Sequence, residues 1–293
     1  MSTELIIALI KATLVLGVLL TNTILLIWFE RKLVAGMQSR VGPDRAGPFG
    51  ILQTVADAIK LLLKEQIMPL KADRAMYLLA PILALVPSFL IFMIIPLGPD
   101  LNIEVGGKNY AIDFVGADLN VGVLYFLALS SIAVYSVVLA GWSSGSKYPL
   151  LGGVRASAQM ISYEAAMGLS LVPVILYSGS LSLVDIVSSQ SGNLSTSIPI
   201  LSSIVSFIPK WNIFPQFIAF GIFFIAAVAE VNRAPFDLVE AEQELVGGFH
   251  TEYSGFRFAM FFLAEYINMF NMCAITATFF LGGWLGPTFE NFL

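Results

Sequence analysis

Long apolar runs separated by short polar segments make up most of this chain. An α-helix needs about 20 apolar residues to cross a hydrocarbon core of ~30 Å, whereas the strands of a membrane barrel alternate over about ten positions. Because the runs are continuous, we predict an all-α, polytopic transmembrane helix bundle. Six spans are expected, at 5–29, 76–96, 121–142, 160–177, 213–229 and 258–284.

The first polar segment starts at the charged triplet of residues 30–32, which we expect to end the first span. It continues through VGPDRAGPFG, whose two Gly-Pro pairs predict a fixed, irregular turn. In 50–65 the apolar residues recur at helical spacing, so an amphipathic helix is predicted. This helix either anchors the chain at the membrane interface or lines a cavity with Asp57 and Lys60.

The distribution of basic residues sets the orientation. Eight of the fifteen Lys and Arg residues lie between 30 and 75, so this loop is predicted on the cytoplasmic or matrix side, with the N-terminus outside. The stretch 198–209 is left open between a span and an outer-surface segment. We expect a single integral membrane domain over 1–293, with this cytoplasmic or matrix loop at 30–75 and an acidic loop on the same side at 230–256.

The composition agrees with this class and narrows the chemistry. Hydrophobic residues make up 57% of the chain and charged residues 12%, against roughly a quarter charged in soluble domains. The only cysteine is Cys273 and the only histidine is His250, which excludes a disulfide, an iron–sulfur cluster and a Cys/His zinc site. No basic surface typical of nucleic-acid binding is present. The glycine pairs at 152–153 and 247–248 are interpreted as turns.

Carboxylates are concentrated in the segment 230–254, between two apolar runs. Pro235 and Asp237, followed by Glu240, are typical of a helix start. Two more acids, Glu164 and Glu265, lie inside predicted spans, where a charged residue costs about 3 kcal/mol to insert and indicates a functional site.

We expect Glu164, Glu230 and Glu265 to converge near one leaflet, where desolvation and mutual repulsion favour proton uptake near neutral pH. This arrangement predicts a proton relay. The alternative is that each acid pairs with a basic residue and only holds helices together. The candidate basic partners are Arg31, Arg40, Lys60, Arg155 and Arg233.

Five sequence blocks occur in order over nearly the whole chain. They are ERK, MQSRVGPDRAGPFGILQTVADAIKLLLKE, LLGGVRASAQMISYE, NRAPFDLVEAEQELVGGFHTEYS and AEYINM. Together they resemble the H subunit of proton-translocating NADH:quinone oxidoreductase (respiratory complex I), the bacterial counterpart of mitochondrial subunit 1. That family has eight spanning helices, whereas six are predicted here and the last two are not found. Val231 and Val239 stand where the family usually has threonine and proline.

The resemblance implies a quinone-chamber and proton-path subunit that couples quinone reduction to proton translocation. It implies no cofactor in this chain, quinone as the substrate, and FMN and iron–sulfur clusters in partner subunits. The implied partners are the other membrane and peripheral subunits of complex I and membrane lipid, with no nucleic acid. The implied location is the bacterial plasma membrane or the mitochondrial inner membrane.

The resemblance also implies roles for individual residues. The implied quinone-chamber residues are Arg31, Gln38, Arg40, Phe49, Asp57, Lys60 and Phe236. The implied proton-path residues are Tyr163, Glu164, Glu230, Asp237, Glu240, Glu242 and Glu265. Arg155 and Arg233 are implied as their charge partners.

Three alternative functions fit parts of the sequence. The first is the homologous membrane subunit of an energy-converting hydrogenase, which the match of the first polar loop disfavours. The second is a structural anchor for the peripheral arm of the complex. The third is a secondary transporter with a carboxylate ion site, which is disfavoured because no internal repeat is found.

Overall fold

The computed structural model describes residues 3–99, 101–105, 108–112, 114–193, 209–237 and 245–286. Its α-helices are α1 (Thr3–Met37), α2 (Gln53–Leu63), α3 (Arg74–Met93), α4 (Gly122–Ser143), α5 (Lys147–Ser178), α6 (Leu183–Ser189), α8 (Phe217–Glu230) and α10 (Phe256–Phe280). Short 3-10 turns are η1 (Pro48–Gly50), η2 (Gly248–His250) and η3 (Gly283–Leu285). The strands are β1 (Leu101–Val105) and β2 (Lys108–Ile112).

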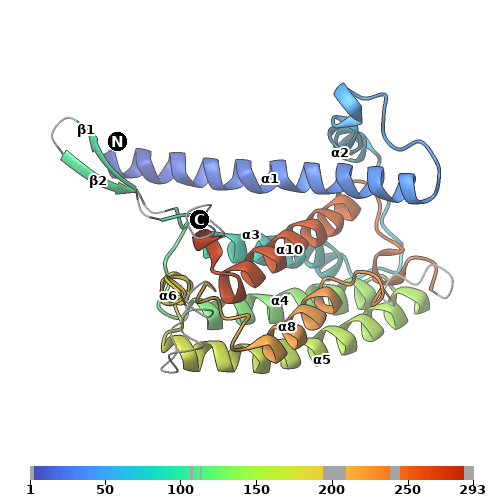
Figure 1. Ribbon diagram of the computed structural model, residues 1–293. Coiled ribbons are helices and arrows are strands. Elements are labelled where there is room, and N and C mark those ends of the chain that lie inside the picture. Colours follow the sequence, from blue (N-terminus) through green and yellow to red (C-terminus); the bar gives the residue numbers. More distant parts are fainter. Residues whose placement is uncertain are drawn as a thin grey trace.

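The helices form a bundle in which chain neighbours pack side by side. Helix α4 lies between α3 and α5, α10 packs on α3, and α8 packs on α5. Helix α1 lies along one side of the bundle and meets it mainly through α10, while α2 lies near the C-terminal end of α1 (Figure 1). The core contains large, fully buried side chains such as Phe126, Phe223 and Phe279.

The prediction of a polytopic helical membrane protein is confirmed. Within the described residues, α1, α3, α4, α5 and α10 are long and apolar enough to cross a membrane. The remaining predicted span, 213–229, is helical only from Phe217, as the 14-residue helix α8. At 1.5 Å per residue α8 is about 21 Å long, which is shorter than the hydrocarbon core. Its C-terminal end lies inside the bundle, since Ala229 is 0% and Glu230 is 7% exposed.

Two predicted boundaries were wrong. The charged triplet at 30–32 does not end the first helix, because Glu, Arg and Lys are good helix formers and α1 continues to Met37. The segment expected to connect the spans 121–142 and 160–177 as a loop is helical from Lys147, as the first turns of α5. The interpretation of Gly152 and Gly153 as a turn was also wrong. A Cβ on Gly152 would lie 2.8 Å from the Gly248 carbonyl carbon, so the glycine allows η2 to approach α5 closely.

Two other regions refine the prediction. The loop after the second span contains an antiparallel hairpin in which β1 pairs with β2. The undecided stretch 198–209 lies outside the described residues except for Pro209, which forms an isolated bridge with Asn193.

The irregular turn and the amphipathic helix of the first polar loop are confirmed. Phe49 has a φ of 55° and Gly50 a φ of 77°, so this turn uses left-handed backbone conformations. The indole nitrogen of Trp28 on α1 donates to the Phe49 carbonyl at 2.9 Å. The turn is therefore attached to α1, and α2 follows it directly.

Candidate functional site: an acid-lined cavity at the end of helix α8

The end of α8 positions two charged side chains in different directions. Asn232 adopts a left-handed conformation with a φ of 54°, which asparagine tolerates at the end of a helix. The N–H of Arg233 donates to the Val228 carbonyl at 3.3 Å, and Pro235 follows, so the helix cannot continue. As a result Glu230 faces α4, whereas Arg233 faces α1 and α10.

Arg233 is shared by two carboxylates from two helices. Its Nη1 lies 2.8 Å from Oε1 of Glu30 on α1, and its Nε lies 3.1 Å from Oε1 of Glu265 on α10. Its guanidinium carbon lies 4.6 Å from the ring centre of Tyr266, whose hydroxyl donates to Oε2 of Glu30 at 2.8 Å. We call Glu30, Arg233, Glu265 and Tyr266 the Arg233 network.

The charge state of Arg233 follows from this network. Burial lowers the pKa of its guanidinium, but Glu265, Tyr266 and Glu30 raise it by more, so the pKa is shifted upward overall. Arg233 therefore stays charged at any physiological pH.

Glu230 has a different environment. Only 7% of the residue is exposed, and its Oε1 accepts a hydrogen bond of 2.9 Å from the Ser130 hydroxyl on α4. Among the described residues its Oε2 is buried without a hydrogen-bond partner. The next residue of α4, Ser131, donates to Glu164 on α5. Adjacent serines of one helix thus hold acids from two others.

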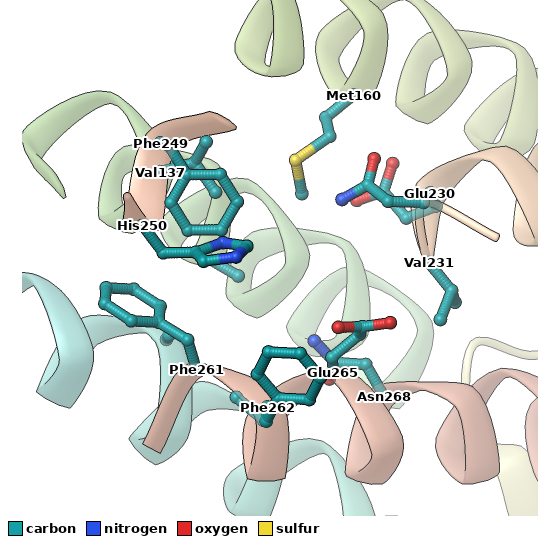
Figure 2. A pocket seen from close by; sticks show the side chains of 14 residues that line it. Val137, Met160, Glu230, Val231, Phe249, His250, Phe261, Phe262, Glu265 and Asn268 are labelled. Atoms are coloured by element: carbon teal, nitrogen blue, oxygen red, sulfur yellow. The ribbon is translucent and has the colours of Figure 1, made fainter. Parts of the chain in front are cut away.

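Glu230 and Glu265 line the same cavity, which has a volume of about 70 Å³. Figure 2 shows both carboxylates at this cavity together with His250 and Asn268. A water molecule occupies about 30 Å³, whereas pockets for drug-sized ligands have roughly 300–1,000 Å³. The cavity therefore has room for a small number of water molecules and is too small for a quinone ring.

His250 forms the aromatic side of this cavity. It is 8% exposed, and its ring packs edge-on against Phe249, Phe258 and Phe262 at centroid distances of 4.9, 5.3 and 6.0 Å. Burial lowers its pKa to about 4, so the imidazole is neutral at neutral pH. Sequence reasoning gave this histidine little weight, whereas the structure buries it in the wall of a cavity that two carboxylates also line.

The segment that carries His250 is attached firmly to α3. Tyr253 stacks on Tyr77 with ring centres 4.1 Å apart, and the Tyr77 hydroxyl donates to the Glu252 carbonyl at 2.8 Å. Burial raises the pKa of Tyr253 to about 12, so this tyrosine stays protonated and neutral. The wall of the cavity formed by η2 is therefore fixed by aromatic packing.

All the predicted chamber residues except Phe236 lie at or just after the end of α1, in η1 or on α2. Arg31 forms an ion pair with Asp57, and Arg40 donates to the Gln38 side chain at 2.7 Å. Phe49 and Lys60 are exposed. The structure thus brings four of these residues into two pairs at the end of the bundle where α2 lies (Figure 1).

The remaining predicted site residues lie on α5 and in the segment after α8. Phe236 packs edge-on against Tyr163 of α5 at 5.4 Å, and the Gln159 amide donates to the Phe236 carbonyl at 2.9 Å. Arg155 is exposed on α5, and Asp237 is the last described residue before 245. Glu240 and Glu242 lie outside the described residues.

Several residues of this site were missed from the sequence. Glu30, Ser130 and Tyr266 could not be paired from the sequence, because their partners lie far away in the chain, and Asn232 was not recognised as the residue that ends α8. The Glu30–Arg233 contact, for example, joins residues 203 positions apart. Within the described part of the chain, no group of three His, Cys, Asp or Glu side chains is placed to hold a metal ion.

Comparisons with known proteins agree with the resemblance. The family model described as NADH dehydrogenase matches residues 10–293. A protein of Geobacter metallireducens named as an H subunit of NADH-quinone oxidoreductase is 52% identical over 89% of this chain and 72% of its own length. The H subunit of Brevibacillus brevis is 50% identical over 94% of this chain and 73% of its own. An H subunit of Koribacter versatilis is 50% identical over 97% and 78%. The chain therefore belongs to the NADH dehydrogenase family, the family of the membrane H subunit of NADH:quinone oxidoreductase.

Proposed function

We propose that this chain supplies the quinone chamber wall and an acidic proton path in a proton-translocating NADH:quinone oxidoreductase. In this proposal FMN and iron–sulfur clusters sit in partner subunits, and quinone is the substrate that the assembled complex reduces. The end of the bundle that carries α2 faces the cytoplasm or matrix, and the N-terminus faces outside. The membrane is the bacterial plasma membrane or the mitochondrial inner membrane.

The observation that carries the proton-path proposal is the convergence of acids from three helices. Glu230 at the end of α8 and Glu265 on α10 line one cavity, and Glu164 on α5 is held by the serine next to the one that holds Glu230. A carboxylate buried without a counter-ion is costly in its charged form, so the pKa of such a group rises toward the neutral range, where it can both bind and release a proton. The water-sized cavity supplies a medium for this exchange.

The chamber proposal rests on the surface formed by α1, η1 and α2. Exposed apolar side chains there include Phe49 (74% exposed) and Leu63 (83% exposed), and the same elements carry the Arg31–Asp57 pair. A surface that combines apolar area with a few fixed polar groups suits a quinone headgroup once partner subunits close it. The contact between Phe236 and Tyr163 connects this proposal to the acids. Tyr163 precedes Glu164 on α5, and Phe236 lies in the segment that follows Glu230 at the end of α8.

The test is Glu230→Gln in the complex assembled with its partners in sealed membrane vesicles. We expect the rate of NADH-driven proton translocation to fall about a hundredfold, which is the lower end of what a positioned proton-transfer group contributes. The matched control is Asp185→Asn on α6, an acid that accepts from Ser180 far from the cavity.

Three outcomes separate the alternatives. Loss of translocation in Glu230→Gln with an unaffected Asp185→Asn supports the proton path. Wild-type translocation in both variants contradicts it. Reduced assembly with normal turnover per assembled complex indicates that the acids only anchor the peripheral arm.

A further inference from the structure

Glu30 on α1 is a carboxylate with both oxygens engaged. Oε1 binds Nη1 of Arg233 at 2.8 Å, and Oε2 accepts from the Tyr266 hydroxyl at 2.8 Å. The contacts come from the loop after α8 and from α10, so Glu30 joins three separate parts of the bundle. Its side chain is 36% exposed, which is more than a purely structural core pair would show.

The Arg233 network contains one cation and two carboxylates. With both Glu30 and Glu265 ionised, the network carries a net charge of −1, because Tyr266 is neutral. If Glu265 takes up a proton, the net charge becomes zero and Arg233 still has Glu30 as its counter-ion. If Glu30 were absent, the same protonation would leave a guanidinium that is 25% exposed without any counter-ion, which is costly in a partly buried site.

We propose that Glu30 is a positioning residue that lets Glu265 accept a proton while Arg233 stays in place. This inference rests on the proposed role of Glu265 in the proton path. The proton reaches Glu265 from the cavity, and the Arg233–Glu30 ion pair remains during the exchange. Without Glu30, Arg233 would hold Glu265 in its ionised form.

The groups that face Glu265 set its pH dependence. They are Glu30 on α1, Arg233 in the loop, Glu230 on α8, His250 on η2 and Tyr266 on α10. The residues that α3, α4 and α5 contribute to the cavity do not titrate. Arg233 is the only cation in this set, and Glu30 is the only acid besides Glu265 that contacts it in the described residues. Glu30 is therefore the residue whose removal changes how Arg233 is shared.

The residue that follows Glu30 belongs to the proposed chamber wall. The next residue of α1, Arg31, pairs with Asp57 of α2, so one turn of α1 contacts α2 on one side and Arg233 on the other. A displacement of α2 would thus act on the same turn that holds Arg233. This is a direct physical connection between the proposed chamber wall and the proposed proton path.

The experiment compares Glu30→Gln and Glu30→Asp in the assembled complex in sealed vesicles, with proton translocation per NADH measured over a series of pH values. We expect the pH profile of Glu30→Gln to move to lower pH by about one unit, equivalent to a tenfold change in proton concentration. Glu30→Asp, which keeps the charge, should restore the profile toward wild type. A merely structural role for Glu30 would change the amount of complex and leave the profile in place.

Controls separate this inference from the proposed function. Wild-type translocation in Glu265→Gln contradicts the proposed function itself. Impaired Glu265→Gln together with an unshifted profile in Glu30→Gln overturns this inference alone. If Glu30→Gln does not assemble, Tyr266→Phe removes only the hydroxyl that holds Glu30 and keeps the ring beneath Arg233. It should shift the profile in the same direction by a smaller amount, and an unshifted profile in this variant would also overturn the inference.

Discussion

Glu230 and Glu265 line the same cavity from two helices, yet their surroundings differ. Glu265 lies 3.1 Å from a guanidinium that stays charged, whereas Glu230 has a single serine hydroxyl as its hydrogen-bond donor within the described residues. Glu230 is also the more buried of the two, at 7% exposed against 22% for the Glu265 side chain. The part of the cavity wall formed by Glu265 is electrostatically compensated by Arg233, whereas the parts formed by Glu230 and by His250 are not. We call the Glu265 part the compensated side and the Glu230 and His250 parts together the uncompensated side.

This difference indicates how one cavity can hold acids in opposite protonation states. An ion pair favours the charged carboxylate, whereas burial without a cation disfavours it. We therefore expect Glu265 to be ionised and Glu230 to be protonated at neutral pH. A protonated acid can then donate a proton to an ionised one at the same cavity, either directly or through water that links them.

The largest expected effect concerns the uncompensated side. The unfolded chain binds a proton on His250 below pH 6.5, whereas the folded chain does so only near pH 4, where burial has moved its pKa. The contribution of His250 to stability is therefore complete above pH 6.5 and is lost as the pH falls toward 4. At about 1.4 kcal/mol per pH unit, the loss is about 3 kcal/mol.

Thermal unfolding of the detergent-solubilised chain as a function of pH measures this loss. His250→Phe is the matched variant, because phenylalanine fits among Phe249, Phe258 and Phe262 and has no proton to bind. Subtracting its pH profile from that of the wild type removes the contribution of all other groups. If the two profiles coincide between pH 6.5 and 4, His250 is accessible to water and the uncompensated side does not exist as described.

A smaller effect is expected on the compensated side. Arg233→Gln removes the cation and leaves Glu30 and Glu265 facing each other. Breaking a fully buried pair costs about 3–5 kcal/mol, and because these side chains are partly exposed we expect about 2 kcal/mol. Lys147→Gln, at the exposed start of α5, is the control for loss of a positive charge and should change the unfolding free energy by less than about 0.5 kcal/mol. Equal effects in both variants would argue against the network.

The smallest effect tests the protonation state of Glu230 through its donor. Ser130→Ala removes its one hydrogen bond, which is worth about 1 kcal/mol if Glu230 is neutral and about 1.5–3 kcal/mol if it is ionised. Ser136→Ala is the control, since this buried serine of the same helix donates to a backbone carbonyl and touches no acid. A difference above about 1.5 kcal/mol between the two variants in unfolding free energy would contradict a protonated Glu230.

The sequence allowed the membrane-spanning architecture to be predicted, because apolar runs report directly on burial in lipid. It also located the amphipathic helix α2 and singled out Glu164, Glu230 and Glu265. The hairpin β1–β2 was missed although Leu101–Val105 alternates in character and a Gly-Gly pair follows it, a pattern typical of hairpins.

The contacts between distant residues could not be predicted in the same way. Hydrophobic periodicity says which face of a helix is buried, but it does not say which helix lies opposite. The pairing of Arg233 with Glu30 and the burial of His250 among phenylalanines both depend on tertiary packing. The contrast between the two sides of the cavity therefore became visible only in the structure.

The central claim is that Glu230 is protonated and Glu265 is ionised in the resting protein at neutral pH. Infrared difference spectroscopy of the purified protein in H₂O and D₂O measures this directly, through the carboxylic-acid C=O stretch, which an ionised carboxylate lacks. We expect a buried carboxyl band that disappears in Glu230→Gln and persists in Glu265→Gln. A band that survives in Glu230→Gln, or that is lost in Glu265→Gln, would contradict the account.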